Sequence, residues 1–274
     1  MRLRMAIATS LLVLAACAPS VTSPIGTSGL DDRQVTELQV ARWQSRFEAG
    51  AFRSRSGMVL PYRIASPPAS TPRPLVFVLH GSGEMGTDNE SQLTPFAASW
   101  VELHDHSELA PIIVAPQVRV RSADYEMCGG IRCASRPGPS FEALLHLFDS
   151  LAASEAIDPS RIYVVGFSMG GATALQLALA RPQLAAAIAV FGAVPPPKHR
   201  APELSQENLL VVQGTRDRNH SIEVMQEWID HLNASGGGAV LETREGMKHK
   251  VPDDMVVHKS WRLRLLEQRL DGGT

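Results

Sequence analysis

The sequence predicts an α/β fold with a mostly parallel, doubly wound sheet. The first observation is that short apolar runs of strand length alternate with segments of helical periodicity along most of the 274 residues. Such alternation is typical of a parallel sheet whose crossover helices cover both faces. The second is a glycine-rich turn, Gly166-Phe167-Ser168-Met169-Gly170-Gly171, which leads directly from an apolar run into a helical pattern.

The predicted strands are short runs of three to seven residues. The first two are separated by Arg53-Ser54-Arg55-Ser56-Gly57, which indicates a hairpin. The third, Leu75 to Leu79, is continuously apolar, as a strand buried on both faces should be. The predicted strands cover residues 47–52, 58–64, 75–79, 112–114, 161–165, 187–191, 209–212 and 240–243.

The predicted helices follow from apolar positions spaced three and four apart. In one of them Ser140 is the expected N-cap, and Leu144, Leu145, Phe148 and Leu151 fall on one face. The predicted helices cover residues 94–103, 141–154, 172–181, 222–232 and 256–270.

The composition is that of an ordinary globular domain. Hydrophobic residues make up 44% and charged residues 20% of the chain, and the formal net charge is −2. A nucleic-acid partner would require a basic face, so we expect no nucleic acid as a partner.

Residues 1–16 are predicted to be a lipoprotein signal peptide. Arg2 and Arg4 precede an apolar run from Met5 to Leu14 that is too short to span a bilayer as a stable helix. The tetrad Leu14-Ala15-Ala16-Cys17 resembles the lipobox of bacterial lipoproteins, in which the cysteine is lipidated and becomes the new N-terminus. The alternative is an ordinary secretory signal with a chance cysteine.

A lipid on Cys17 would place the protein in the cell envelope, anchored to a membrane and facing the periplasm. Ala18 after the cysteine resembles the pattern that leaves lipoproteins free to reach the outer membrane. Residues 17–45 are then a tether rich in Pro, Ser, Thr and Gly, followed by a short helix that Asp31 or Asp32 would cap. Residues 46–274 form the predicted catalytic domain.

Besides Cys17, the chain has two cysteines, Cys128 and Cys133. In an oxidising compartment their Cys-Gly-Gly-Ile-Arg-Cys spacing favours a disulfide, which would shape the segment from about Gln117 to Pro139. Free thiols are the alternative. A metal site is disfavoured, because two thiols without nearby partner ligands do not complete a tetrahedral set.

Ser168 is the predicted nucleophile. The G-x-S-x-G pattern, with a strand before it and a helix after it, forces the serine onto a sharp turn with its hydroxyl exposed. A serine hydroxyl is a poor nucleophile near neutral pH, so it needs an imidazole to take its proton and a carboxylate to orient that imidazole. Asp217 and His249 each follow one of the last two predicted strands and supply these groups.

Other residues compete for these roles. His220 is the one serious rival for the base, because it lies so near Asp217 in sequence, but it precedes a helix instead of following the last strand. Asp253 and Asp254 are rivals for the orienting carboxylate, although close sequence neighbours of His249 seldom point at it productively.

The tetrahedral intermediate of acyl transfer needs fixed N–H donors. The residue after the nucleophile, Met169, supplies one backbone donor at the start of the helix. The glycine-rich turn after the third strand supplies the other, and we expect this donor to be the N–H of Ser82.

Several segments together resemble the small esterase and predicted-peptidase group within the prolyl-oligopeptidase and dienelactone-hydrolase branch of the α/β-hydrolases. The resemblance covers the chain from about Phe47 to the C-terminus. The matching segments are residues 60–63, 79–89, 113–117, 166–171, 214–217 and 246–249.

This resemblance implies a three-layer α/β-hydrolase core of about eight strands, a metal-free triad of Ser168, Asp217 and His249 without a cofactor, and action on ester bonds. The group includes carboxylesterases, feruloyl-type esterases and polyhydroxyalkanoate depolymerases. Two departures concern specificity: Arg218-Asn219-His220-Ser221 replace the apolar residues and proline that usually follow the acid, and the usual tryptophans are missing around the two cysteines.

The predicted function is therefore that of a serine esterase acting on small substrates. A peptidase or thioester hydrolase with the same triad is the alternative within the enzyme class, and a non-catalytic lipoprotein that binds an envelope component is the alternative outside it. The segment between Phe191 and Leu209 is too short for a large lid, so we expect an open pocket for small substrates.

Overall fold

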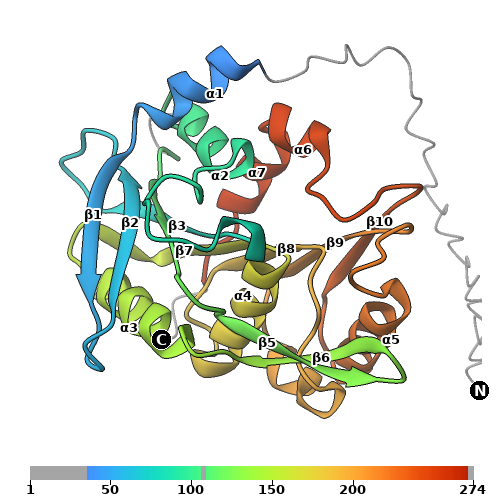
Figure 1. Cartoon of the computed structure of the whole chain (residues 1–274). Helices are drawn as coiled ribbons and strands as arrows, with labels where there is room; N and C mark the ends of the chain where they lie inside the picture. The colour runs from blue at the N-terminus through green and yellow to red at the C-terminus, as the bar shows by residue number, and fades with distance from the viewer. Residues whose placement is uncertain (1–35, 106–108, 271–274) are drawn as a thin grey trace, which may run out of the picture. The chain divides into compact units, whose positions relative to one another are not determined.

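An eight-stranded sheet organises residues 36–105 and 109–270, the part of the chain that the computed structural model describes. The strand order is β1-β2-β4-β3-β7-β8-β9-β10 (Figure 1). The β1–β2 and β2–β4 pairs are antiparallel, and the remaining pairs are parallel. The strands are β1 (Glu48–Arg53), β2 (Val59–Ala65), β3 (Arg73–Leu79), β4 (Ile112–Pro116), β7 (Ile157–Phe167), β8 (Ala187–Phe191), β9 (Leu209–Gly214) and β10 (Val240–Arg244).

Helices cover both faces of this sheet. The α-helices are α1 (Glu37–Gln44), α2 (Pro95–Ala98), α3 (Phe141–Ala152), α4 (Met169–Ala180), α5 (Ile222–Ala234), α6 (Asp253–Val257) and α7 (Ser260–Leu266). In Figure 1, α3, α4 and α5 lie on one face, and α1, α2, α6 and α7 lie on the other. None of the helices in the described ranges is both long enough and apolar enough to cross a membrane.

The central strand β3 shows why the two faces are equally buried. Leu75, Phe77 and Leu79 belong to the core beneath α3, α4 and α5, whereas Val76 and Val78 belong to the core on the other face. Successive side chains of a strand point to opposite faces, so a continuously apolar run fits only a sheet covered on both sides. The predicted three-layer α/β architecture is confirmed.

Two predicted helices are wrong in detail. The segment predicted at residues 256–270 is two short helices, α6 and α7, because the backbone of His258 is extended and the Trp261 indole N–H donates to the Met255 carbonyl across the break at 2.7 Å. The segment predicted at 94–103 begins as α2 and continues as the 3₁₀ helix η2 (Ser99–Asp105).

One predicted helix cap also differs. Ser140 precedes α3, but its hydroxyl donates to the Val120 carbonyl instead of capping the helix. Thr36 caps α1 through its side chain. The predicted cap at Asp31 or Asp32, the tether, the signal peptide and Cys17 all lie outside the described residues.

The segment that contains the two cysteines is a β-hairpin, which the sequence did not predict. Strands β5 (Ala123–Cys128) and β6 (Ile131–Pro137) pair antiparallel as a separate sheet, and a Cys128–Cys133 disulfide joins them. The two residues between the strands, Gly129 and Gly130, both have positive φ, a conformation for which glycine has no steric penalty.

The hairpin is fixed to the domain through Ser135. The Ser135 N–H donates to the Pro195 carbonyl at 2.7 Å, and the Gln176 side chain on α4 donates to the Ser135 carbonyl at 2.9 Å. Figure 1 shows the hairpin crossing beside α4. It therefore lies close to α4, the helix that follows Ser168.

Candidate active site

Ser168 lies on a strained turn between β7 and α4. Its φ of 54° and ψ of −115° are unusual for a residue with a side chain. Flanking glycines make the turn possible: a Cβ on Gly166 would lie 2.3 Å from the Gly170 carbonyl oxygen, and a Cβ on Gly170 would lie 2.1 Å from the Leu79 carbonyl oxygen. Only glycine allows the strand, the helix and the end of β3 to approach so closely.

The structure brings Ser168, His249 and Asp217 into a continuous hydrogen-bonded chain. The Ser168 hydroxyl oxygen lies 2.8 Å from Nε2 of His249, and Nδ1 of His249 lies 2.7 Å from Oδ2 of Asp217. The three residues follow β7, β10 and β9, whose carboxyl ends meet at one edge of the parallel sheet. With Nδ1–H donated to the carboxylate, Nε2 is free to accept the serine proton.

Asp217 is held as an anion beneath the imidazole. Its side chain is only 1% exposed, and Oδ1 accepts the backbone N–H groups of Asn219 and His220 at 2.8 and 3.0 Å. Burial raises the pKa of this carboxyl, but the bond and charge of His249 and the two backbone bonds outweigh burial, so the pKa lies below its ordinary value.

Neither rival carboxylate contacts His249. Asp253 pairs with Lys250 at 2.5 Å, and Asp254 pairs with Arg244 at 3.2 Å. Both are engaged on the protein surface. Asp217 is therefore the carboxylate that can orient the imidazole.

His220 contacts Asp217 and His249 and not Ser168. Its ring packs edge-on against His249, with centroids 4.7 Å apart, and only 1% of the residue is exposed. Its Nε2 lies 3.0 Å from Nη1 of Arg132 on the hairpin, and its Nδ1 contacts the Gly192 carbonyl. Arg132 has no acceptor, so it donates to Nε2, and Nδ1–H is given to Gly192.

This environment keeps His220 neutral. Burial is the main cause that lowers the pKa of its imidazole to about 4. The charges of His249 and Arg132 lower this pKa further, whereas the bond to Gly192 raises it. Sequence reasoning weighed His220 only as a competing base. The available signal was its place three residues after Asp217, where its N–H could reach the carboxylate, but the contacts of its ring could not be seen.

Asp217, His220 and His249 are also the one group in the described residues whose potential metal ligands lie within 4.8 Å of one another. The nitrogens of both rings are already engaged, and the Arg132 guanidinium lies 3.0 Å from His220 Nε2. A divalent cation would have to replace these bonds next to an existing positive charge. The arrangement does not fit a metal.

The two predicted oxyanion donors start neighbouring elements. Met169 is the first residue of α4, and Ser82 is the first residue of the 3₁₀ helix η1 (Ser82–Glu84). His80 fixes the turn between β3 and η1: its Nε2 accepts the Val118 N–H at 3.1 Å, and its Nδ1–H donates to the Gly81 carbonyl at 2.6 Å. Burial lowers the pKa of His80, and the role of this residue is to hold the turn in place.

Comparisons with known proteins concern the family and the fold. Residues 136–251 match the model of the dienelactone hydrolase family. A solved structure of a thermostable esterase superimposes with a TM-score of 0.73 at 23% identity, over 83% of this chain and 64% of the esterase, so the chain spans less than two thirds of that protein. The chain has the α/β-hydrolase fold.

Other solved structures resemble this chain less closely. S-formylglutathione hydrolase from Staphylococcus aureus has a TM-score of 0.54 at 15% identity, over 74% of this chain and 92% of that protein. Dipeptidyl peptidase 4 of Porphyromonas gingivalis has a TM-score of 0.54 at 14% identity, over 81% of this chain and 35% of that protein. No curated protein matches the sequence. The family match and the fold together support a hydrolase-type enzyme.

Two hollows of the structure adjoin His249. One, which we call the side cavity, measures about 300 Å³ and is bounded by the end of β3, α2, α6 and the loop after His249; its lining includes Gly81, Phe96, Phe167, His249, Val251 and Val256. The other, about 840 Å³, lies between the Asp217 and His249 loops and is lined by polar and cationic residues, among them Arg216, Arg218 and Lys248. The segment between β8 and β9 folds as the 3₁₀ helix η3 (Lys198–Leu204).

Proposed function

We propose that this chain is a serine hydrolase that cleaves carboxylic ester bonds of small substrates through an acyl-enzyme intermediate. The observation that carries the proposal is the chain of bonds from the Ser168 hydroxyl through His249 to Asp217, on a strained strand-to-helix turn. Such a turn presents the hydroxyl at the edge of the sheet, where a substrate can reach it.

The reaction follows from the hydrogen-bond pattern. Nε2 of His249 takes the hydroxyl proton as Oγ of Ser168 attacks the ester carbonyl, and Asp217 stabilises the imidazolium that forms. The backbone N–H groups of Met169 and Ser82 are the proposed donors to the oxyanion. His249 then gives its proton to the leaving alcohol. In the second half of the cycle His249 takes a proton from a water molecule, which attacks the acyl-enzyme, and returns it to Ser168 as the acid is released.

The same triad is compatible with peptidase or thioesterase activity. Among proteins that share the fold are a peptidase and an S-formylglutathione hydrolase, so amides and thioesters belong in any substrate panel. A panel of one acyl group offered as ester, thioester and anilide would separate the three. Ester turnover at least about tenfold above the other two supports the proposal.

The decisive experiment is active-site labelling with a fluorophosphonate probe. The wild type should be labelled, and Ser168→Ala should lose both labelling and turnover of 4-nitrophenyl butyrate. Ser235→Ala, which changes an exposed serine at the end of α5, is the matched control and should retain both. Unchanged turnover in Ser168→Ala would remove this serine from the mechanism. If the wild type reacts with neither reagent, the non-catalytic envelope-binding alternative takes its place.

We also propose that Cys17 carries a lipid that anchors the enzyme to the outer membrane, facing the periplasm. The support is the small-small-cysteine pattern behind the short apolar run near the N-terminus. Metabolic labelling with an alkyne fatty acid in a bacterial host should tag the wild type and not Cys17→Ser. A wild type that is secreted without label would contradict the anchor.

A further inference from the structure

The short helix η1 carries the proposed oxyanion donor of Ser82 but cannot hold its own position. It has three residues, and the bond that closes it runs from the Glu84 N–H to the Gly81 carbonyl at 3.4 Å. The N–H of Ser82 itself donates to no atom in the described part of the chain, so it is available to a ligand. A donor to an oxyanion has to be fixed before the reaction, so contacts from outside η1 must set its place.

The side chain of Gln117 holds the end of η1. Gln117 directly follows β4 and is fully buried. Its Nε2 donates to the Glu84 carbonyl at 3.1 Å and to Oδ1 of Asp88 at 2.9 Å. Its Oε1 accepts the Asn89 N–H at 2.7 Å. These three bonds of the amide all go to the segment that follows Ser82 in the chain.

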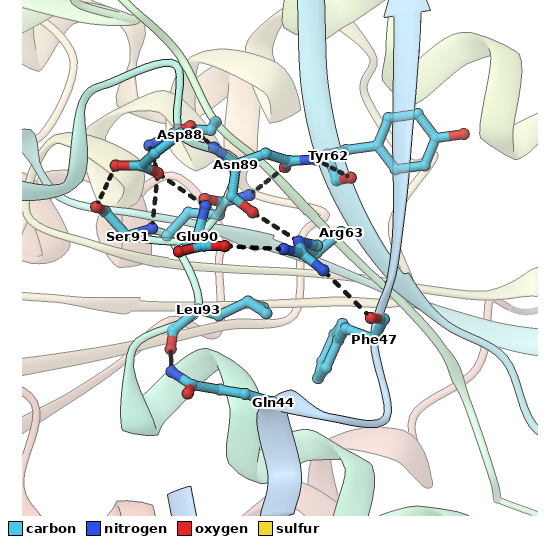
Figure 2. Close-up of polar contacts among 11 residues, drawn as sticks. Gln44, Phe47, Tyr62, Arg63, Asp88, Asn89, Glu90, Ser91 and Leu93 are labelled. Atoms are coloured by element: carbon cyan, nitrogen blue, oxygen red, sulfur yellow. Dashed lines mark hydrogen bonds and ion pairs between the residues drawn. The ribbon is translucent and has the colours of Figure 1, made fainter. Parts of the chain in front are cut away.

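Asp88 fixes the direction in which the amide of Gln117 points. Asp88 accepts the hydroxyl and the N–H of Ser91 and the N–H of Glu90 (Figure 2). These bonds, together with that of Gln117, hold the pKa of this carboxyl well below its ordinary value, so the group is an anion that can only accept. Exchanging the oxygen and nitrogen of Gln117 would set two acceptors against each other. A donor therefore always faces the Glu84 carbonyl.

The loop after η1 is in turn fixed to β2 and α1. Asn89 has a φ of 56°, which asparagine tolerates better than most residues with a side chain. Figure 2 shows its two bonds to β2: Nε of Arg63 donates to the Asn89 carbonyl at 2.6 Å, and Nδ2 of Asn89 donates to the Tyr62 carbonyl at 3.1 Å. Farther along, Nε2 of Gln44 on α1 donates to the Leu93 carbonyl at 2.6 Å (Figure 2). The loop therefore offers η1 a fixed support.

We propose that Gln117 is a positioning residue of the active site, whose amide ties η1 to this anchored loop and so keeps the N–H of Ser82 where the oxyanion forms. This inference rests on the proposed ester hydrolysis and adds the group that prepares one of its two oxyanion donors. Gln117 is fully buried, so it acts through η1 and not on the substrate. Without its bond to the Glu84 carbonyl, the donor loses its fixed place, which weakens binding of the transition state more than binding of the substrate.

Steady-state kinetics with 4-nitrophenyl butyrate test this role. Gln117→Met keeps the length of the side chain but has no donor for the Glu84 carbonyl. We expect kcat to fall about 10- to 100-fold with KM within about twofold, which is part of the roughly 10²- to 10³-fold that loss of a whole oxyanion donor costs. The Ki of a butyl trifluoromethyl ketone, which forms a tetrahedral adduct with Ser168, should rise by the same factor. A folded Gln117→Met enzyme that keeps kcat within about threefold, or that loses activity only through KM, would overturn the inference.

Gln44→Met is the matched control. It makes the same substitution and also removes a bond to a backbone carbonyl of this loop, but at Leu93, beyond the segment that Gln117 binds. Its kcat and Ki should stay within about twofold of the wild type, and an equal loss in both variants would overturn the special role of Gln117. Should Gln117→Met not fold, Gln117→Glu at pH 8 replaces it, because a carboxylate keeps the shape but cannot donate. Wild-type kcat in that variant would equally overturn the inference.

Ser82→Pro removes the donor itself and completes a double-mutant cycle. Proline suits the first position of a helix, and Gly81 before it already has a ψ of 179°, as a residue that precedes proline should. We expect kcat to fall about 10²- to 10³-fold, and Gln117→Met added to Ser82→Pro should lower it by less than about threefold more, because the donor that Gln117 positions is gone.

Two outcomes of the cycle would overturn the inference. Additive losses would show that Gln117 acts on something other than the N–H of Ser82, and wild-type kcat in Ser82→Pro would show that this N–H is not an oxyanion donor. Neither outcome touches the proposed function, because fluorophosphonate labelling and the Ser168→Ala variant judge the ester hydrolysis separately.

Discussion

His249 has two aromatic neighbours, and its surroundings differ sharply between them. Next to His220, every polar group is engaged: Asp217, His220 and Arg132 are bonded to one another, to the backbone or to His249. Next to Phe167, whose ring centroid lies 4.9 Å from that of His249, the side cavity has mostly apolar walls. The difference indicates a division of work, because filled polar contacts fix a proton-transfer geometry and a hollow leaves room for substrate.

We call the surroundings of His249 next to His220, where the polar groups are engaged, the closed side. Its arrangement also explains how the cation of Arg132 can lie so near the imidazole of His249. Arg132 is separated from His249 by the neutral ring of His220. A protonated His220 would place like charges beside the imidazolium that forms during acyl transfer and would oppose it. The low pKa of His220 therefore suits the neighbouring base.

The largest expected effect on the closed side is that of Asp217→Asn. The amide keeps the size of the carboxylate but can donate to Nδ1 of His249, which favours the wrong tautomer and removes the charge that stabilises the imidazolium. We expect kcat for 4-nitrophenyl butyrate to fall about 10³- to 10⁴-fold, with KM little changed. Steady-state kinetics on the purified variant measure it.

Asp253→Asn is the matched control for that change. Asp253 is much closer to His249 in sequence than Asp217 is, but it binds Lys250 at the surface, so its loss should change kcat by less than about threefold. If Asp253→Asn costs as much as Asp217→Asn, the two carboxylates share the orienting role and the closed side extends farther than the contacts indicate.

Sequence reasoning reached the features that local patterns determine. The turn at Ser168, the apolar strands and the order of Ser168, Asp217 and His249 each depend on neighbouring residues or on the general rule that strand ends meet at one edge. The hairpin was missed because its strands are partly exposed and short of apolar residues. The helix predicted over 256–270 was wrong because periodicity persists across the break at His258.

The part played by His220 could not be assigned from sequence, for a physical reason. The tautomer of His220 depends on Gly192 after β8 and on Arg132 in the hairpin. Such contacts arise between elements distant in the chain. Their roles therefore become visible only when all partners of each polar atom are counted.

The second prediction concerns the free energy of unfolding as a function of pH and the part of it that His220 contributes. The unfolded chain binds a proton on His220 near pH 6.5, whereas the folded protein does so only near pH 4, so the unfolded state holds more protons between these values. The free energy of unfolding should consequently fall as the pH drops from about 6.5 to about 4, by about 3 kcal/mol from this group. On the cavity side Glu84, whose pKa is raised, acts in the opposite direction, because its folded form keeps a proton that the unfolded chain has lost.

Urea unfolding of the wild type and His220→Gln at pH 7 and pH 4.5 isolates the contribution of His220 to the pH dependence of the free energy of unfolding. Glutamine can donate to Gly192 and accept from Arg132 but does not titrate, so the variant should lose less stability on acidification than the wild type. Glu84→Gln should do the reverse and lose more. Identical pH dependence in the wild type and His220→Gln would show that this imidazole is not held neutral by the fold.

The smallest expected effect is that of the hairpin disulfide. Arg132 lies between Cys128 and Cys133, and the bridge limits where its guanidinium can go, but the hairpin is also fixed through Ser135. Replacing both cysteines by serine should lower kcat/KM only about two- to fivefold and the free energy of unfolding by at most about 2 kcal/mol, because the loop that the bridge closes is short.

Reduction of the wild type with dithiothreitol tests the same point without mutation. It should reproduce the kinetics of the double serine variant and leave that variant unchanged. KM for 4-nitrophenyl butyrate should not respond, since the side cavity shares no lining residue with the hairpin. If reduction raises KM as much as it lowers kcat, the two surroundings of His249 are mechanically coupled, and the division between a side that fixes the proton transfer and a side that leaves room for substrate fails.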